Sequence, residues 1–168
     1  MKTMPSEAQI EASAFAVLDT CRKQGLRVTT AESCTGGLIV GALTEIAGSS
    51  DVIGRGFVTY SNEAKMAMLG VQAGTLSNHG AVSGETVLEM AAGALEAAAD
   101  DADIAVAVSG VADPGGGSPD KPVGTVWLAV QRKGQAGHAE RQHFSGDRRA
   151  VRIKTVGRAL ELLLGAAK

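Results

Sequence analysis

A serine at the corner between a predicted strand and a predicted helix is the first candidate for chemistry in this chain. It is Ser33, in the run Thr30-Ala31-Glu32-Ser33-Cys34-Thr35-Gly36-Gly37. Free amides at the positive end of a helix can stabilise an oxyanion or hold a phosphate, so Ser33 could be a nucleophile. The same pattern also suits a residue that only caps the helix. Cys34 is a rival nucleophile, because a thiol at a helix start can be acidified, although such a cysteine also serves as buried packing.

The second candidate segment is Phe57-Val58-Thr59-Tyr60-Ser61-Asn62-Glu63-Ala64-Lys65, which contains the single tyrosine of the chain. Tyr60 ends a predicted strand, and Ser61 begins a predicted helix. Lys65 comes four residues after Ser61, so both lie on one face of that helix. A lysine there is either a solvated surface charge or a desolvated base that acts on a serine. The spacing alone does not bring Lys65 to Ser33.

A long glycine-rich segment follows the apolar run 104–108, which is typical of a strand buried on both faces. Residues 110–122 include three prolines and Gly115-Gly116-Gly117, and they exceed an ordinary connection in length. Glycines let a backbone approach a ligand closely, so Ser109, Gly110 and these glycines are candidate binding residues. The alternative is a plain surface loop.

A basic segment begins with Phe144-Ser145-Gly146-Asp147-Arg148-Arg149 and continues to Arg152 and Lys154. Guanidinium groups there could bind a phosphate, or the segment could be a solvated basic face. The sequence does not contain the phosphate-binding loop motif of nucleotide-binding proteins, because Ala42-Leu43 stands where that motif needs Lys and Ser or Thr. His138 and His143, five apart on a predicted strand, would point to opposite faces and are expected at an exposed edge. We therefore expect no metal and no cofactor.

Alternating helices and strands must position these segments. The predicted order is α-β-α-β-α-α-β-β-β-α, without an internal repeat or a linker, and it favours a mixed sheet covered by helices on both sides. The stretch 70–80 is rich in turn-forming residues and is predicted as turns. Strands are predicted at 27–31, 57–60, 104–108, 123–130 and 138–144. The predicted helix caps are Ser6 (with Gln9 as capping-box partner), Ser61, Ser83 and Asp147.

Length and composition restrict the class of protein. The 168 residues suit a single domain, 1–168, and 45% hydrophobic residues suffice for a core. Sixteen Lys+Arg against eighteen Asp+Glu argue against a nucleic-acid binder. The apolar runs are too short for a bilayer, and the start of the chain does not read as a secretory signal. Two cysteines make no disulfide framework, so we expect a cytoplasmic protein without a membrane partner.

Together, these segments resemble the C-terminal domain family of the competence/damage-inducible protein CinA, in its stand-alone form, which includes nicotinamide mononucleotide deamidases. The resemblance covers about residues 6–165 and implies a three-layer α/β/α fold with a mixed, mostly parallel sheet. It also implies hydrolysis of the amide of nicotinamide mononucleotide to nicotinate mononucleotide and ammonia by a metal-free serine–lysine mechanism. The segments that carry it are 30–37, 56–65, 80–83, 109–117, 121–127 and 144–148.

Carried onto the matching positions, the resemblance makes Ser33 the nucleophile and Lys65 the base, with Tyr60 beside them. Amides at 34–36 or 109–110 would stabilise the oxyanion, and the glycine-rich loop and basic side chains would hold the 5′-phosphate. The substrate-binding residues predicted in this way are Cys34, Thr35, Gly36, Ser109, Gly110, Gly115, Gly116, Gly117, Lys121, Arg148 and Arg149.

Asp113 departs from the family pattern, which has a glycine before the proline of the glycine-rich loop. A carboxylate there would oppose an anionic nucleotide unless it points away. This residue favours a second hypothesis, a non-catalytic module that binds a nucleotide or a partner protein, whereas intact Ser33, Tyr60 and Lys65 favour the amidase. A third hypothesis is an amidase for another phosphorylated or pyridine carboxamide. Small apolar surface residues also predict a homo-oligomer.

Overall fold

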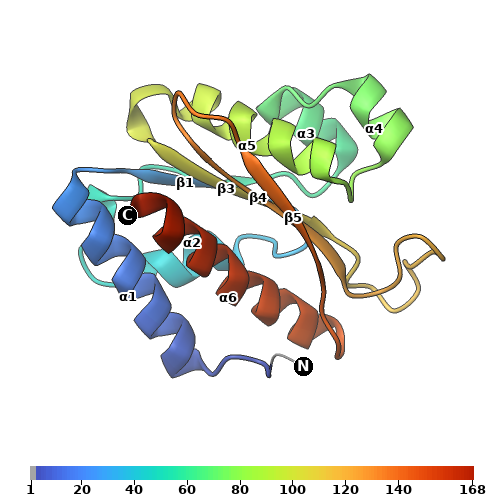
Figure 1. The fold of residues 1–168 in the computed structure, drawn as a ribbon, viewed down its shortest axis with the longest axis horizontal. Coiled ribbons are helices and arrows are strands. Elements are labelled where there is room, and N and C mark those ends of the chain that lie inside the picture. Colours follow the sequence, from blue (N-terminus) through green and yellow to red (C-terminus); the bar gives the residue numbers. More distant parts are fainter. Residues whose placement is uncertain (1–2) are drawn as a thin grey trace.

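A five-stranded sheet forms the centre of the computed structural model, which describes residues 3–168 (Figure 1). The strand order is β2-β1-β3-β4-β5. β1 pairs in parallel with β2 and β3, and β4 runs antiparallel to both of its neighbours, so four of the five strands point the same way. The mixed sheet expected from the sequence is confirmed. The strands are β1 (Val28–Glu32), β2 (Phe57–Val58), β3 (Ile104–Gly110), β4 (Thr125–Arg132) and β5 (His138–His143).

Helices cover both faces of the sheet, which gives the expected three layers (Figure 1). One layer holds α1 (Glu7–Gln24), α2 (Leu38–Thr44) and α6 (Arg148–Ala167). The other holds α3 (Asn62–Leu69), α4 (Ala73–His79) and α5 (Gly84–Ala98). None of the helices in the described part of the chain has the length and apolar character needed to cross a membrane.

The central strand β3 is buried from both sides, as its continuous apolar run predicts. Ile104, Val106 and Val108 face the core under α1 and α6. Ala105 and Ala107 face the core under α5. This alternation follows from the two-residue period of a strand. Ser109, the last residue but one of β3, is also buried.

The helix starts predicted from single capping residues are confirmed. Ser6 accepts a hydrogen bond from the amide of Gln9, and the Gln9 side chain completes the capping box. Ser61, Ser83 and Asp147 each accept a hydrogen bond from the amide three residues further on. The cap at Ser61 sets the start of the helix that carries Lys65.

The prediction of turns throughout 70–80 is wrong, because α4 lies within that stretch. None of its residues is buried, so the sequence carries no apolar period that would have indicated a helix. Its first turn is held from outside by Glu89 of α5. That carboxylate accepts from the amide of Gln72 at 2.8 Å and from the hydroxyl of Thr75 at 2.5 Å.

The helix that carries Lys65 is packed closely against its neighbour. A Cβ atom at Gly93 of α5 would overlap the carbonyl oxygen of Leu69, the last residue of α3. Glycine is therefore required where these two helices meet. This contact sets how closely the end of α3 approaches α5.

Candidate active site

Ser33 and Lys65 meet at the carboxyl end of the parallel strands. The Lys65 Nζ lies 3.0 Å from the Ser33 Oγ. Ser33 directly follows β1, and Lys65 is on the helix that follows β2. Because Glu32 pairs with Val58 in the parallel register, both strand ends reach the same edge of the sheet. The topology thus joins two residues that their spacing in the sequence could not connect.

Lys65 is buried to 1% exposure, although its position after a helix cap also suited a surface charge. Its amino group donates to the carbonyl oxygen of Thr59 at 2.9 Å and approaches that of Tyr60 at 3.5 Å. Within residues 3–168 it forms no ion pair with a carboxylate. Burial therefore lowers the pKa of Lys65 below its ordinary value.

Cys34 is adjacent to Ser33, but its environment opposes a role as nucleophile. Its side chain is buried, and this burial raises the pKa of the Cys34 thiol to about 12. The reactive form of a cysteine is the thiolate, which is scarce at neutral pH when the pKa is that high. Of the two rivals at the corner, the structure favours Ser33.

The positive end of α2 is occupied by the protein itself. The amides of Ile39 and Val40, in its first turn, donate to the two carboxylate oxygens of Glu32 at 2.8 and 3.0 Å. The amide of Gly36 donates to the carbonyl oxygen of Ser33 at 3.0 Å. The expectation that free amides at this corner and helix start hold an oxyanion or a phosphate is therefore wrong for these three groups.

A cavity of about 270 Å³ opens beside the Ser33–Lys65 pair. Eight of the residues that the sequence predicted as site residues line it: Ser33, Cys34, Tyr60, Lys65, Ser109, Gly110, Gly116 and Arg148. The remaining lining residues are Asn62, Ala81, Val82, Val111, Ala112 and Asp113. The sequence offered a signal for several of these, since Ala81 and Val82 lie in one of the segments that resemble the CinA family.

Arg148 lies at this cavity together with Tyr60. Its Nη2 donates to the Tyr60 hydroxyl at 3.0 Å, and the pKa of Arg148 is raised, chiefly by Tyr60 and in smaller part by Asp113. The Tyr60 side chain is 60% exposed. The Asp113 carboxylate accepts from the amide of Gly115 at 3.2 Å, so it is turned toward its own loop while still acting on Arg148.

The comparison with known proteins identifies the family. The CinA C-terminal domain family matches residues 10–167. The chain belongs to this family. It is 56% identical over 142 residues to the nicotinamide-nucleotide amidohydrolase PncC of Escherichia coli (strain K12), covering 84% of this chain and 85% of that one. It is 50% identical over 159 residues to the PncC of Enterobacter agglomerans, covering 95% and 96% of the two chains.

Solved structures of CinA proteins share the fold. The crystal structure of the competence/damage inducible protein CihA from Agrobacterium tumefaciens matches with a TM-score of 0.92 and 48% identity over all of both chains. A CinA superfamily protein from Klebsiella pneumoniae matches with a TM-score of 0.89 and 41% identity, covering 94% of this chain and 97% of that one. The α/β fold expected from the resemblance is thus confirmed.

Six residues predicted to bind substrate in this CinA domain do not line the cavity. Lys121 instead donates from Nζ to the carbonyl oxygen of His79 at 2.6 Å. Arg149 lines a different groove, beside α1 and α2, because neighbouring helical residues point about 100° apart. The other four are Thr35, Gly36, Gly115 and Gly117.

Arg152 of the basic segment has a structural role at the corner that follows Ser33. Its guanidinium donates to the carbonyl oxygens of Cys34 and Thr35, both at 3.1 Å. These contacts tie α6 to the turn that follows Ser33. Of the four basic residues in this segment, Arg148, Arg149, Arg152 and Lys154, only Arg148 lines the cavity.

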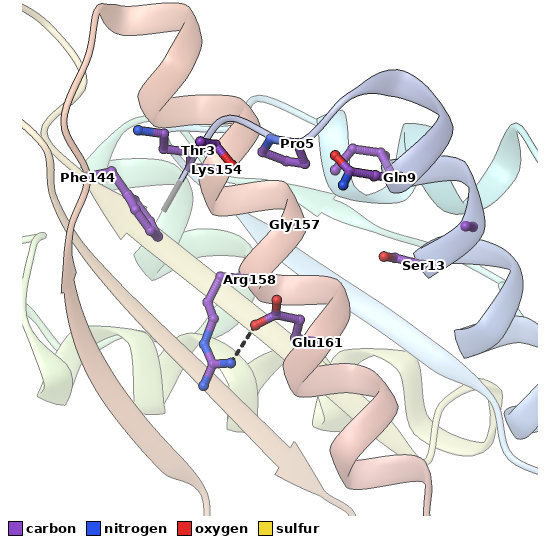
Figure 2. Close-up of a pocket in the computed structure, with 11 residues that line it drawn as sticks. Thr3, Pro5, Gln9, Ser13, Phe144, Lys154, Gly157, Arg158 and Glu161 are labelled. Carbon is purple, nitrogen blue, oxygen red and sulfur yellow. Dashed lines mark hydrogen bonds and ion pairs between the residues drawn. The ribbon is translucent and has the colours of Figure 1, made fainter. Parts of the chain in front are cut away.

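A second cavity of the CinA domain, of about 480 Å³, shares no lining residue with the first and lies between α1 and α6 (Figure 2). Its charged groups are already paired. Arg158 binds Glu161 at 2.6 Å, as the dashed line in Figure 2 shows, and also Glu140 at 2.6 Å. Lys154 donates to the carbonyl oxygen of Ser145 at 2.8 Å. This cavity therefore offers no reactive group comparable with the pair at Ser33.

The remaining titratable residues suggest no metal centre. Among residues 3–168, no three His, Cys, Asp or Glu side chains are grouped so that they could hold a metal ion. His138 and His143 are both exposed on β5, at the edge of the sheet, as expected.

Proposed function

We propose that this chain is a nicotinamide-nucleotide amidohydrolase, which hydrolyses nicotinamide mononucleotide to nicotinate mononucleotide and ammonia with Ser33 as nucleophile and Lys65 as base. The observation that carries the proposal is the 3.0 Å contact between the Ser33 Oγ and a fully buried Lys65 Nζ at a cavity. Relatives that are 56% and 50% identical bear the name of this activity. The intact pair favours an enzyme over a non-catalytic binding module.

Lys65 is arranged to act as a neutral amine. A neutral amino group has two N–H groups and one lone pair. The carbonyl oxygens of Thr59 and Tyr60 can each accept a hydrogen bond from one of the two N–H groups. The lone pair then faces the Ser33 hydroxyl. Burial favours this neutral form, because it disfavours the charged ammonium.

The reaction then follows in two halves. In the first, the Ser33 Oγ attacks the carboxamide carbon as its proton passes to the Lys65 Nζ, and a tetrahedral intermediate forms. The C–N bond breaks, Lys65 returns the proton to the nitrogen, and ammonia leaves. In the second, water attacks the acyl ester, Lys65 takes its proton and gives it to the Ser33 Oγ, and the carboxylate product is released.

The amide of Gly110 is the best-placed oxyanion donor. The carbonyl of Val108 on β3 points toward β1, where it accepts a hydrogen bond from the amide of Ser33. The amide of Val111, just after β3, points toward β4, where it donates to the carbonyl of Thr125. Since backbone groups alternate along a strand, the Gly110 amide faces the side of β1, just beyond its end. A Cβ at Gly110 would lie 2.7 Å from the Val126 Cγ2, so glycine is required there.

Arg148 is the proposed contact for the 5′-phosphate. Apart from Lys65 it is the one Lys or Arg among the described residues that line the cavity, and a guanidinium suits the planar geometry of phosphate oxygens. The hydroxyl of Tyr60 orients it. Because Glu32 occupies the end of α2, we assign the phosphate to this side of the cavity.

The direct test is to incubate the purified chain with nicotinamide mononucleotide and to measure ammonia and nicotinate mononucleotide together. We expect both products in equal amounts, and none from a Ser33→Ala variant prepared in the same way. A wild-type chain that releases neither product, while its circular dichroism shows it folded, would overturn the proposal.

We further propose that the enzyme acts in the cytoplasm as a homo-oligomer. Both cysteines, Cys21 and Cys34, are free thiols, which suits a reducing compartment. Phe15 and Met68 are large apolar side chains that are about half exposed, at 55% and 46%, and such surfaces favour association. Light scattering coupled to size-exclusion chromatography would test the assembly, and a monomer at all concentrations would contradict it.

A further inference from the structure

We propose that Glu32 is a positioning residue for the reaction at Ser33, and that its buried carboxylate holds the corner that carries the nucleophile at a fixed place relative to Lys65. This inference rests on the proposed function for its assay, but its structural basis is independent of the substrate. Glu32 is the last residue of β1, directly before Ser33, and it is fully buried.

The Glu32 carboxylate accepts four hydrogen bonds. Oε1 accepts from the Thr35 hydroxyl at 2.7 Å and from the amide of Ile39 at 2.8 Å. Oε2 accepts from the Thr30 hydroxyl at 3.2 Å and from the amide of Val40 at 3.0 Å. The donors come from the strand before Ser33, from the corner after it, and from α2, so a single side chain ties all three together.

The corner needs such a tie because its local sequence provides none. α2 begins after Gly37, which has a φ of 98° and supplies no capping side chain. Gly36 also has a positive φ, of 58°. Two consecutive glycines leave the direction of the helix poorly determined by local preference. The caps that a Ser or Asp beside the helix would give are instead given by Glu32 from the end of the strand.

The main chain of Glu32 extends the same control to the base. Its carbonyl oxygen accepts from the amide of Thr59 at 2.9 Å. The carbonyl of Thr59 in turn accepts from the Lys65 Nζ at 2.9 Å. Glu32 therefore connects the nucleophile corner with the carbonyl that aims the lysine, without touching the cavity itself.

A matched set of three variants tests this role. Glu32→Gln keeps size and shape but replaces one carboxylate oxygen with an NH₂ group. The hydroxyl of Thr30 or Thr35 can rotate and accept a hydrogen bond from this NH₂ group. The backbone amide of Ile39 or Val40 cannot, so one of these N–H groups is left facing another donor. Thr35→Val removes the donor that lies in the corner. Thr30→Val removes the donor on the strand and is the control, since it removes one hydrogen bond to the same carboxylate but leaves the bonds from the corner and from α2 in place.

We expect Glu32→Gln and Thr35→Val to lower kcat by about 10- to 100-fold with KM changed less than about twofold, because a displaced nucleophile costs rate rather than affinity. Thr30→Val should keep kcat within about twofold. Thr30→Val and Thr35→Val should lower the Tm by similar amounts. The pH profile of kcat/KM should keep its midpoint in all three variants, since the pKa of Lys65 is lowered chiefly by burial, which these substitutions leave in place.

The inference is overturned if Thr35→Val keeps wild-type kcat, or if Thr30→Val loses as much kcat as Thr35→Val, because the loss would then follow stability and not position. The comparison of these two variants decides the question even if Glu32→Gln does not fold. An acid shift of the midpoint in Glu32→Gln would also overturn it, by showing that the carboxylate acts on the pKa of Lys65.

A substrate-independent readout separates this inference from the proposed function. A fluorophosphonate reacts with an activated serine: the Oγ–P bond forms, fluoride leaves, and the serine proton passes to the base. We expect intact-mass spectrometry to show labelling of the wild type at Ser33 and labelling slowed at least tenfold in Thr35→Val. If wild type is labelled but does not release ammonia, only the proposed function fails. If wild type is neither labelled nor active, both fail.

Discussion

The replacement of Lys65 by methionine or arginine is the sharpest test of the proposed chemistry. Lysine with its ordinary pKa of 10.5 is neutral in about one molecule in 3,000 at pH 7, and each unit by which burial lowers that pKa raises the neutral fraction about tenfold. Methionine has no proton acceptor of this kind, and arginine remains charged at any usable pH. Both variants should therefore lose nearly all turnover.

The two replacements should differ in stability, because Lys65 is fully buried. Methionine fits the space of the lysine chain and removes the cost of burying an amine. It also leaves the carbonyl of Thr59 without its donor, which destabilises the fold by about 1–3 kcal/mol. These effects oppose each other, so the Tm of Lys65→Met should stay within a few degrees of wild type. Arginine is larger and stays charged, and overpacking adds about 1–3 kcal/mol of destabilisation.

The lowered pKa of Lys65 determines how activity and stability change with pH. A lowered lysine pKa means that activity rises with pH through that value and falls below it. The unfolded chain binds more protons than the folded one between the lowered pKa and 10.5, so the contribution of Lys65 to stability also rises with pH across that window. Relative to wild type, Lys65→Met should be most stable at neutral pH, and the difference should shrink toward pH 10.5.

The assays are kcat/KM from pH 6 to 10 for the wild type, turnover of both variants at one pH, and Tm at neutral and alkaline pH. Substantial activity in Lys65→Arg would refute the neutral-base role and leave Lys65 as an electrostatic contact. A wild-type profile that is flat from pH 6 to 10 would show that no base of lowered pKa takes part in this range.

Three further predictions concern the other cavity residues. Ser33→Ala should abolish turnover with little change in Tm, whereas Cys34→Ala should stay active because its thiol remains protonated; the opposite pattern of ammonia release would assign the nucleophile to Cys34. Arg148→Met should lower kcat/KM for nicotinamide mononucleotide by about tenfold or more, because one charge-assisted hydrogen bond to the phosphate is lost. It should leave kcat/KM for nicotinamide riboside, which has no phosphate, unaffected; equal losses for both compounds would show that Arg148 does not bind the phosphate. Asp113→Gly should leave activity equal or raise it, because its carboxylate faces its own loop and partly offsets the charge of Arg148; a large loss of kcat/KM would give Asp113 a role of its own.

Features that depend on neighbouring residues could be predicted from the sequence. The caps at Ser6, Ser61, Ser83 and Asp147 were correct because a cap bonds to an amide only three residues away. The buried strand 104–108 was correct because its apolar run is continuous. The resemblance to the CinA family extended this to the fold, since its motifs are spread along nearly the whole chain.

Features that depend on distant residues could not be predicted in this way. Local spacing left Lys65 as either surface charge or base, because its burial depends on the pairing of β1 with β2. Lys121 and Arg149 were assigned to the substrate because they lie in or next to the CinA-like segments, but the direction of each side chain is set by its own surroundings. The role of the Glu32 carboxylate was missed for the same reason, since its backbone partners Ile39 and Val40 come from the helix beyond the corner.

The parallel pairing of β1 has a consequence for how the protein acquires activity after synthesis. Both neighbours of β1 come from distant parts of the chain, with Glu32 paired to Val58 on one side and Val108 on the other. Contacts between residues far apart in sequence form slowly, because a long loop must close first, whereas the β4–β5 hairpin is local. In refolding from denaturant, secondary structure should therefore return before turnover, and ammonia release should follow the slowest kinetic phase.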